Sequence, residues 1–223
     1  MYDTVFISYK EINKEENWKK FSDRFPMAKR VDGVQGIHQA HIVAAKEAVT
    51  DMFWIIDADA VLVNGFELCY MPKKEDRDAV HVWRSKNPIN DLEYGYGGVK
   101  LFPRLATVNM DTSKPDMTTS ISDKFILMPD VSNITDFNVD EFSTWRSAFR
   151  ECAKLSSKVI DRQKEDETNA RLKTWTTVGH DRQYGKYALA GATAGMEFGL
   201  SSGSDLGLIN DFEWLKEQYS ANI

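Results

Sequence analysis

The run DMFWIIDADA at residues 51–60 constrains the fold of this chain more than any other stretch. Four consecutive large apolar residues, from Phe53 to Ile56, lead directly into two carboxylates. An apolar run this short predicts a strand buried on both faces, as in a parallel sheet covered by helices. Asp57 and Asp59 are two residues apart, so in extended backbone both side chains leave the strand on the same side.

The acidic pair is therefore expected at the carboxyl end of a central strand, which is where open α/β sheets bind ligands. Two hard oxygen ligands at such a place suit Mg²⁺ or Mn²⁺ holding a diphosphate, because the metal cancels charge that the carboxylates would repel. The alternative is that Asp57 and Asp59 only end the strand and begin a turn. The buried strand before them favours the metal site.

Length and composition limit the possible classes of protein. The chain has 223 residues, 42% of them hydrophobic, enough for one large domain or a domain with an appendage. Its formal net charge is -6, so contact with DNA would need a local basic patch. Cys69 and Cys152 form no C-x-x-C pair, which predicts reduced thiols and a cytoplasmic protein. The N-terminal run reads as a strand, and no run reaches transmembrane length, so no membrane partner is expected.

The order of predicted elements indicates an α/β fold: a mixed, mostly parallel sheet flanked by helices, with a helical C-terminal part. Strands are predicted at residues 5–7, 28–31, 53–56, 61–63, 79–83, 94–102 and 124–128. Helices are predicted at residues 15–21, 37–48, 141–156, 161–174, 181–199 and 211–219, and loops at 112–122 and 130–140. The small residues in the 181–199 helix predict tight helix packing. We expect one domain over residues 1–223, with halves that meet at residue 110.

Several polar residues near the predicted strand ends are candidate ligand contacts. Ser8 and Tyr9 follow the first strand, where a nucleotide-binding α/β fold contacts the base or ribose. Gly33 and Gly36 precede a helix whose N-terminus favours an anion, and His38 lies in its first turn. An ordinary strand exit and a locally hydrogen-bonded histidine are the alternatives.

Two further groups of residues carry possible chemistry. Tyr94, Tyr96, Gly97 and Gly98 precede an apolar strand and predict close backbone approach to a flat group such as a sugar or base, or else a β-bulge. A second group lies on the 141–156 helix, where two arginines one turn apart could clamp a phosphate and a glutamate lies opposite the apolar stripe: Arg146, Arg150 and Glu151.

The order of elements and the acidic pair resemble GT-A type glycosyltransferases, in which a D-x-D motif and a divalent metal hold a nucleotide sugar. More narrowly, five runs resemble a group of small glycosyltransferase-like proteins from tailed phages. They are VFISY at 5–9, GVQGIH at 33–38, MFWIIDAD at 52–59, YGYGGVKLF at 94–102 and WRSAFRE at 145–151. Residues 141–223 match the general GT-A pattern poorly.

The resemblance implies a UDP-sugar donor bound by residues 1–110, and an acceptor side formed by residues 111–223. It implies Mn²⁺ or Mg²⁺ on Asp57 and Asp59, and positive charge from Lys100 and the two arginines at the diphosphate. For an inverting reaction Glu151 is the expected base, with Asp123 and Asp136 as rivals; a retaining reaction needs no such base. Some phage enzymes of this kind add glucose or arabinose to 5-hydroxymethylcytosine, which makes double-stranded DNA a possible acceptor.

Two other functions remain open from the sequence. A nucleotidyltransferase acting on a sugar phosphate would also use paired carboxylates and a metal. Such enzymes usually have a glycine-rich loop directly after the first strand, and residues 9–14 contain no glycine. A non-catalytic binding protein with a nucleotide-sugar fold is the third possibility, and the D-x-D sequence opposes it only weakly.

Overall fold

The computed structural model describes residues 1–95, 97–159 and 164–223, and these form two compact units. The first unit comprises Met1–Lys86 and Glu93–Asp136, and the second comprises Asn87–Leu92 and Phe137–Ile223. The second unit thus includes a short segment from the middle of the chain. The units divide the chain at residues 136 and 137, whereas the halves expected from the sequence meet at residue 110.

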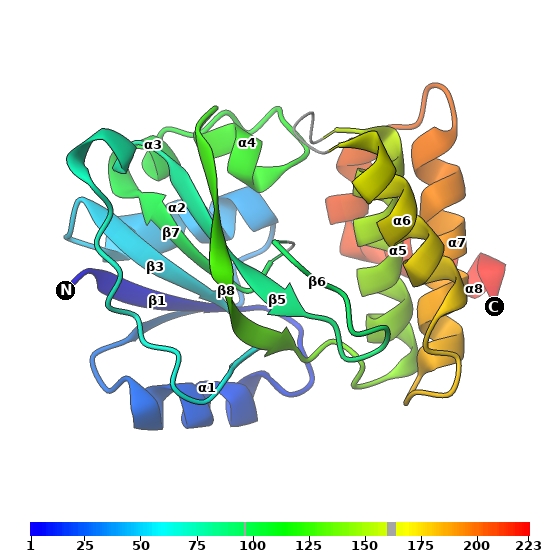
Figure 1. Cartoon of the computed structure of the whole chain (residues 1–223), viewed down its shortest axis with the longest axis horizontal. Helices are drawn as coiled ribbons and strands as arrows, with labels where there is room; N and C mark the ends of the chain where they lie inside the picture. The colour runs from blue at the N-terminus through cyan, green and yellow to red at the C-terminus, as the bar shows by residue number, and fades with distance from the viewer. Residues whose placement is uncertain (96, 160–163) are drawn as a thin grey trace. The chain divides into compact units, whose positions relative to one another are not determined.

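A mixed sheet forms the centre of the first unit (Figure 1). Its order is β2-β1-β3-β7-β5-β8-β4, and β6 pairs with β5. The strands are β1 (Asp3–Ser8), β2 (Lys29–Asp32), β3 (Met52–Asp57), β4 (Ala60–Leu62), β5 (Val80–Lys86), β6 (Glu93–Tyr94), β7 (Val99–Pro103) and β8 (Phe125–Thr135). Parallel pairings join β1 to β2, β1 to β3 and β5 to β8, and the other pairings are antiparallel. The predicted α/β fold with a mixed sheet flanked by helices is confirmed. The prediction that the sheet is mostly parallel is wrong, because three of the strand pairings in the described residues are parallel and four are antiparallel.

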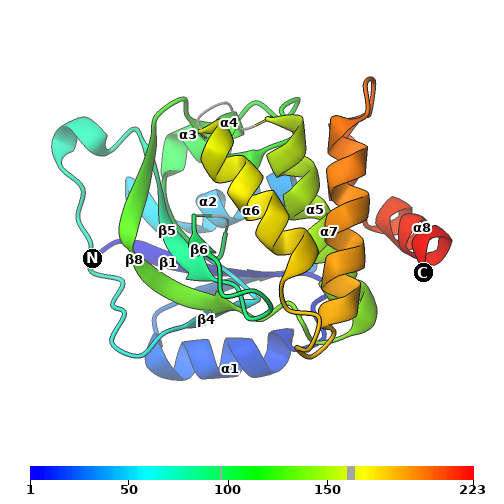
Figure 2. The same ribbon diagram turned by 45° about the vertical axis from the view of Figure 1, so that its right-hand side comes forward.

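Helices cover both faces of this sheet, as Figures 1 and 2 show. One face packs against α1 (Lys14–Arg24), whose Phe21 joins a core with Phe6 and Trp83. The other face packs against α2 (Ile37–Glu47), and the short helices of this unit are α3 (Arg104–Val108), α4 (Met117–Ile121) and the 3-10 turn η1 (Lys74–Asp76). The sheet is therefore the middle layer of three.

Strand β3 divides its side chains between these two layers. Phe53 and Ile55 belong to the core on the α2 face, and Met52, Trp54 and Ile56 belong to the core on the α1 face. All five side chains are 0% exposed, which confirms the predicted strand buried on both faces. Because the faces alternate, Asp57 continues the row of Phe53 and Ile55 on the α2 face.

Strand β8 is longer than its sequence indicates, and the loop predicted at residues 130–140 is wrong over its first part. The strand continues through Pro129 to Thr135. A register shift in the β5–β8 pairing pairs Met128 with Trp83 and then Val131 with Arg84, so Pro129 lies in a β-bulge. A bulge frees the position from donating a ladder hydrogen bond, which is why proline is tolerated there.

The loop predicted at residues 112–122 is also wrong in part, because α4 occupies its second half. The Asp116 carboxylate accepts hydrogen bonds from the backbone N–H of Thr118 (3.0 Å) and Thr119 (3.1 Å), which caps the helix. Met117 and Ile121 then enter the core on the α2 face. The single strand predicted at 94–102 is two strands, β6 and β7.

The second unit is helical in its described residues. It contains α5 (Glu141–Ser157), α6 (Glu165–Thr177), α7 (Gly185–Leu200), the 3-10 turn η2 (Leu206–Asn210) and α8 (Phe212–Asn222). The predicted helix at 161–174 is confirmed as α6 from Glu165 onward, and residues 161–163 lie outside the described part. Helices α5 and α7 lie side by side (Figure 2), and Gly191 and Gly195 of α7 sit directly on the α5 backbone. This confirms the tight packing predicted from the small residues of α7.

Candidate functional site

The carboxyl ends of three neighbouring parallel strands lie at one edge of the sheet. In the register of β1, Ser8 pairs with Asp32 of β2, and Ile7 pairs with Asp57 of β3. The side chains that end these strands are Ser8, Asp32 and Asp57, and Asp59 follows two residues later. The register therefore brings Ser8, Asp32 and Asp57 to the edge where an open α/β sheet binds its ligands, with Ser8 and Asp32 on the α1 face and Asp57 on the α2 face. Asp59 lies in the turn that follows β3.

Asp57 is held by residues that begin strand β7. Its Oδ2 atom lies 2.5 Å from the Lys100 ammonium and accepts a second hydrogen bond from the Gly98 N–H at 3.2 Å. The Asp57 N–H donates to the Gly98 carbonyl oxygen at 2.9 Å. The Asp57 side chain is still 32% exposed, whereas that of Lys100 is 8% exposed. The carboxylate is thus fixed in place but open to a ligand.

Burial alone would raise the pKa of Asp57, because it disfavours the charged form. The positive charge of Lys100 opposes this, with smaller contributions from His41 and from the hydrogen bonds of Lys100 and Gly98. The resulting pKa of Asp57 is below its ordinary value. Asp57 is therefore a carboxylate at neutral pH, as metal ligation requires.

The backbone conformation at Gly98 favours glycine. Its φ of +83° is in the left-handed region, and a Cβ there would lie 2.6 Å from the Asn133 side-chain nitrogen. Asn133 is fully buried and accepts hydrogen bonds from Ser85 (2.9 Å) and Ser132 (2.8 Å). The group that approaches the Gly98 backbone closely in this structure is therefore the Asn133 side chain. This contact fixes the loop that reaches Asp57.

The other predicted residues of this loop take several positions. Tyr94 is buried, at 3% exposure, and pairs with Ser85 in the sheet. The Gly97 carbonyl oxygen accepts a hydrogen bond from the Ser85 hydroxyl at 2.8 Å. Tyr96 lies outside the described residues. The role of these residues toward an acceptor stays a prediction.

At the end of β1, the buried Ser8 belongs to a polar cluster that reaches the surface at Asp32. Its hydroxyl donates to Asp32 Oδ1 at 2.6 Å and accepts from Arg30 Nε at 3.1 Å. Lys14 Nζ reaches the same Asp32 oxygen at 2.7 Å. Burial opposes ionisation of Asp32, but the hydrogen bonds from Lys14 and Ser8 lower its pKa overall. Tyr9 follows, and its N–H donates to a Glu11 carboxylate oxygen at 2.6 Å.

The sequence interpretation did not place Asp32, Lys14 or Arg30 at this site, and it considered Arg30 only as part of a basic edge. A signal for Asp32 was present, because it follows strand β2 just as Asp57 ends β3. Lys14 carried no comparable signal, since its approach to Asp32 depends on how α1 lies over the sheet. Arg30 is two residues before Asp32 on β2, so the two side chains leave the strand on the same face.

The two histidines of α2 have different environments. His38 Nε2 lies 3.2 Å from the Ser120 hydroxyl, so this half-buried ring has a hydrogen-bond partner that is distant in sequence. His41 is 3% exposed, and its Nδ1 contacts the Ile37 carbonyl oxygen at 2.7 Å. Burial, followed by the positive charge of Lys100, lowers the pKa of His41 to about 4. His41 is accordingly neutral at pH 7.

The depressed pKa of His41 predicts a loss of stability in mild acid. Between pH 6.5 and about 4 the unfolded chain binds a proton at His41 that the folded protein excludes, so stability falls as the pH falls through this window. At pH 5 the loss from His41 is about 2 kcal/mol. The groups that share its field are Asp57 on β3, Lys100 on β7 and His38 on α2.

This expectation is checked by urea unfolding of the native protein and of His41→Leu at pH 7.5 and pH 5. Carboxylates that titrate in the same range are common to both proteins and cancel in the difference. Between pH 7.5 and pH 5 the free energy of unfolding of the native protein should fall by about 2 kcal/mol more than that of the variant. Equal losses in the two proteins would contradict a buried neutral His41.

Three predicted site residues, Arg146, Arg150 and Glu151, lie on α5 in the second unit. The Arg150 guanidinium donates to the Ile209 carbonyl oxygen (2.8 Å) and to Asn210 Oδ1 (3.0 Å), and the Arg146 guanidinium lies 5.1 Å from the centre of the Phe212 ring. Each arginine therefore ties α5 to the segment that follows α7.

The candidate bases differ in exposure. Glu151, predicted either to be exposed or to face a cleft, is 7% exposed and lies 3.3 Å from the Lys154 ammonium, so its side chain is not on the open surface. Asp123 is 92% exposed, with Lys114 at 3.8 Å. Asp136 Oδ2 accepts a hydrogen bond from Asn13 Nδ2 at 2.6 Å.

The donor set at the end of β3 fits a metal that is only partly held by protein. Among the described residues no group of three or more His, Cys, Asp or Glu side chains is placed to hold a metal ion. Mg²⁺ is commonly bound by one or two carboxylates, with substrate phosphates and water completing its shell. Asp57, ionised and partly open, and Asp59, also partly exposed, supply such a pair.

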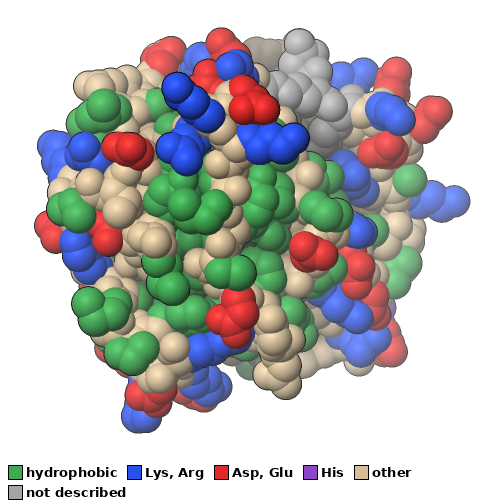
Figure 3. All heavy atoms as spheres, turned by 60° about the vertical axis from the view of Figure 1, so that its left-hand side comes forward, with side chains coloured by type: hydrophobic (Ala, Val, Ile, Leu, Met, Phe, Trp, Pro, Cys, Tyr) green, Lys and Arg blue, Asp and Glu red, His purple; other side chains and the backbone are tan. Residues whose placement is uncertain are grey.

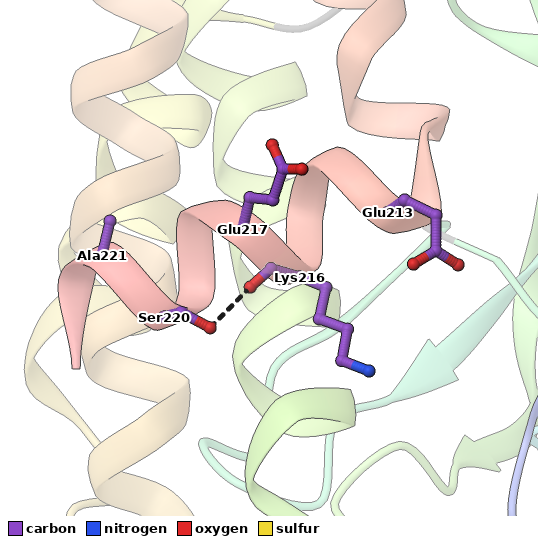
Figure 4. Close-up of a pocket in the computed structure, with 5 residues that line it drawn as sticks. All are labelled: Glu213, Lys216, Glu217, Ser220 and Ala221. Atoms are coloured by element: carbon purple, nitrogen blue, oxygen red, sulfur yellow. Dashed lines mark hydrogen bonds between the residues drawn. The ribbon is translucent and has the colours of Figure 1, made fainter.

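A pocket on the second unit gathers none of the predicted residues. Figure 4 shows that it lies along α8 and is lined by Glu213, Lys216, Glu217, Ser220 and Ala221. The Ser220 hydroxyl donates to the Lys216 carbonyl oxygen at 3.1 Å, a contact within the helix. Because all these residues come from one exposed helix face, the pocket adds nothing to the site on the sheet.

Comparison with known proteins leaves the family of this chain open. No protein-family model matches the sequence, and no curated protein matches it significantly. Across the described residues, every helix is too short or too polar to span a bilayer.

Proposed function

We propose that this protein is a metal-dependent glycosyltransferase of the GT-A type that moves a sugar from a UDP-sugar to a hydroxyl acceptor. The observation that carries the proposal is the position of Asp57 at the carboxyl end of buried strand β3, beside the end of β1, with Asp59 in the turn that follows. The element order from β1 to β3, followed by the glycine-rich entry to β7, supports the GT-A assignment.

The residues at the strand ends have separate tasks in this proposal. Ser8, Tyr9 and Asp32 would contact the nucleoside, and Lys14, which is paired with Asp32, would add positive charge beside it. Asp57 and Asp59 would hold the divalent metal, which acts as a Lewis acid and neutralises charge on the leaving diphosphate. For an inverting course, Glu151, Asp123 and Asp136 are the candidate bases, and the first of these is already paired with Lys154.

The proposed acceptor to test first is 5-hydroxymethylcytosine in double-stranded DNA. A target base must leave the helical stack to reach a pocket, and phosphate contacts make such binding strongly salt-dependent. On the face shown in Figure 3, Lys and Arg side chains are interspersed with Asp and Glu, and hydrophobic side chains lie between them. With a net charge of -6, DNA contact would rely on local cations, and a carbohydrate or protein acceptor would show little salt dependence.

A screen of UDP-sugars with Mn²⁺ tests the proposal. The screen includes UDP-glucose and UDP-arabinose. The UDP-sugar that serves as donor is expected to raise the unfolding temperature of the protein only when Mn²⁺ is present, and its slow hydrolysis should release UDP. Release of pyrophosphate from a nucleoside triphosphate and a sugar phosphate would instead identify a nucleotidyltransferase. If no nucleotide or nucleotide sugar binds with or without Mn²⁺, the protein is a non-catalytic binding protein.

A further inference from the structure

Lys100 is a charged residue in a place that normally excludes charge. It pairs with Ile55 in the antiparallel β3–β7 ladder, in the interior of the sheet, and its side chain is 8% exposed. Its neighbours Val99 and Leu101 enter the core on the opposite face. A buried ammonium is costly unless it is paired, so the position of Lys100 requires an anion.

Asp57 is that anion. Among the described residues it supplies the carboxylate within ion-pair distance of Lys100 Nζ, at 2.5 Å, and the same Oδ2 atom is hydrogen-bonded by Gly98. Lys100 is nearly enclosed while Asp57 is 32% exposed, so the ammonium holds the carboxylate from its buried side. The rest of the carboxylate stays available to a ligand.

We propose that Lys100 is a positioning residue that holds Asp57 and keeps free divalent cations off the site, so that tight metal binding requires a nucleoside diphosphate. This inference rests on the proposed function and assigns Lys100 a different task from contacting the diphosphate. Its consequence is an ordered site, in which metal and nucleotide enter together.

The charges of the site explain this dependence. Lys100 neutralises Asp57, and Asp59 in the adjoining turn brings the formal charge of these three side chains to -1. A divalent cation added alone would reverse that sign beside a buried ammonium, which repels it. A diphosphate brings its own negative charge and its own oxygen ligands, so it offsets the repulsion and completes the shell that two carboxylates leave open.

Mn²⁺ binding, followed by electron paramagnetic resonance of the free ion, tests the proposal without measuring catalysis. The native protein should bind Mn²⁺ at least about tenfold more tightly with saturating UDP than without it. Lys100→Met removes the charge and keeps an unbranched side chain. In the absence of UDP, this variant should bind Mn²⁺ at least about tenfold more tightly than the native protein does. UDP should then increase the Mn²⁺ affinity of the variant by a smaller factor than it does for the native protein.

Two further variants serve as controls. Lys124→Met removes an ammonium that lies 2.5 Å from Asp78 on the exposed surface, so it should bind Mn²⁺ as the native protein does. Asp57→Asn should weaken UDP-dependent Mn²⁺ binding, because it removes a ligand of the metal. If Lys100 had a purely structural role, Lys100→Met would bind Mn²⁺ more weakly than the native protein, as Asp57→Asn does. That result would overturn the role inferred for Lys100 and leave the proposed function standing.

The native protein also decides the question if Lys100→Met does not fold. Tight Mn²⁺ binding that is equal with and without UDP would refute the role of Lys100 and leave the proposed metal site intact. Absence of Mn²⁺ binding under both conditions would overturn the inference together with metal-dependent transfer.

Discussion

Asp57→Asn is expected to lower kcat/KM for transfer from the UDP-sugar by about 10²- to 10⁴-fold. The reason is that the proposed Lewis acid contributes several kcal/mol to the transition state, and each 1.36 kcal/mol is about a factor of ten. The amide keeps the shape of the side chain but loses the charge that holds both the metal and Lys100. The measurement is steady-state transfer at several Mn²⁺ concentrations, together with the unfolding temperature of each variant.

Asp59→Asn separates chemistry from folding in this experiment. It is expected to reduce transfer strongly while the ion pair between Lys100 and Asp57 stays in place. Asp23→Asn is the matched control, because Asp23 is an exposed carboxylate paired with Lys19 on α1. Full transfer with unchanged metal dependence in both Asp57→Asn and Asp59→Asn would refute the proposed function.

Local patterns predicted much of the fold because they report which side chains must be buried. The run from Phe53 to Ile56 is apolar at every position, and only a strand covered on both faces buries all four residues. The apolar stripe at residues 141–156 likewise predicted a helix with one buried face. The structure confirms it as α5, which spans Glu141–Ser157. Such patterns need no knowledge of the partner.

Elements that depend on a distant partner were missed. Strand β8 continues past Pro129 because the β5 strand shifts register to accept a bulge, and nothing local to Pro129 reports that shift. Helix α4 is one short turn whose stability comes from the Asp116 cap and from Met117 in the core. A polar segment of this length therefore resembles a loop until its packing is known.

The candidate site shows the same limit. The sequence predicted Asp57 and Asp59 in extended backbone at one strand end. The structure confirms this position for Asp57, but Asp59 lies in the turn after β3, so the expected extended backbone between them is wrong. The pairing of Lys100 with Asp57 spans 43 residues and depends on the antiparallel register of β3 and β7, which spacing along the chain does not determine. Lys100 was predicted as a site residue, but its contact with Asp57 required the fold.

Gly195→Ala is expected to destabilise the second unit, because an added methyl group on α7 would meet the backbone of α5. A Cβ at this position would lie 2.1 Å from the Phe149 carbonyl oxygen, and backbone cannot move aside as a side chain can. Overpacking of this kind costs about 1–3 kcal/mol and occasionally more, which exceeds the gain of about 1 kcal/mol in helix propensity from glycine to alanine. We expect a net loss of about 2 kcal/mol, or a Tm lower by about 4–8 °C.

Thr193→Ala is the matched control, because Thr193 lies on the exposed side of the same helix and the change also favours helix formation. Its Tm should change by less than about 2 °C, since surface substitutions usually stay within about 0.5 kcal/mol. Gly191→Ala should behave like Gly195→Ala, because its Cβ would lie 2.2 Å from the Trp145 carbonyl oxygen. Hydrogen exchange should become faster in α5 and α7 and stay unchanged in β1 and β3. If Gly195→Ala instead raised the Tm, helix propensity would dominate and the two helices would not be in backbone contact.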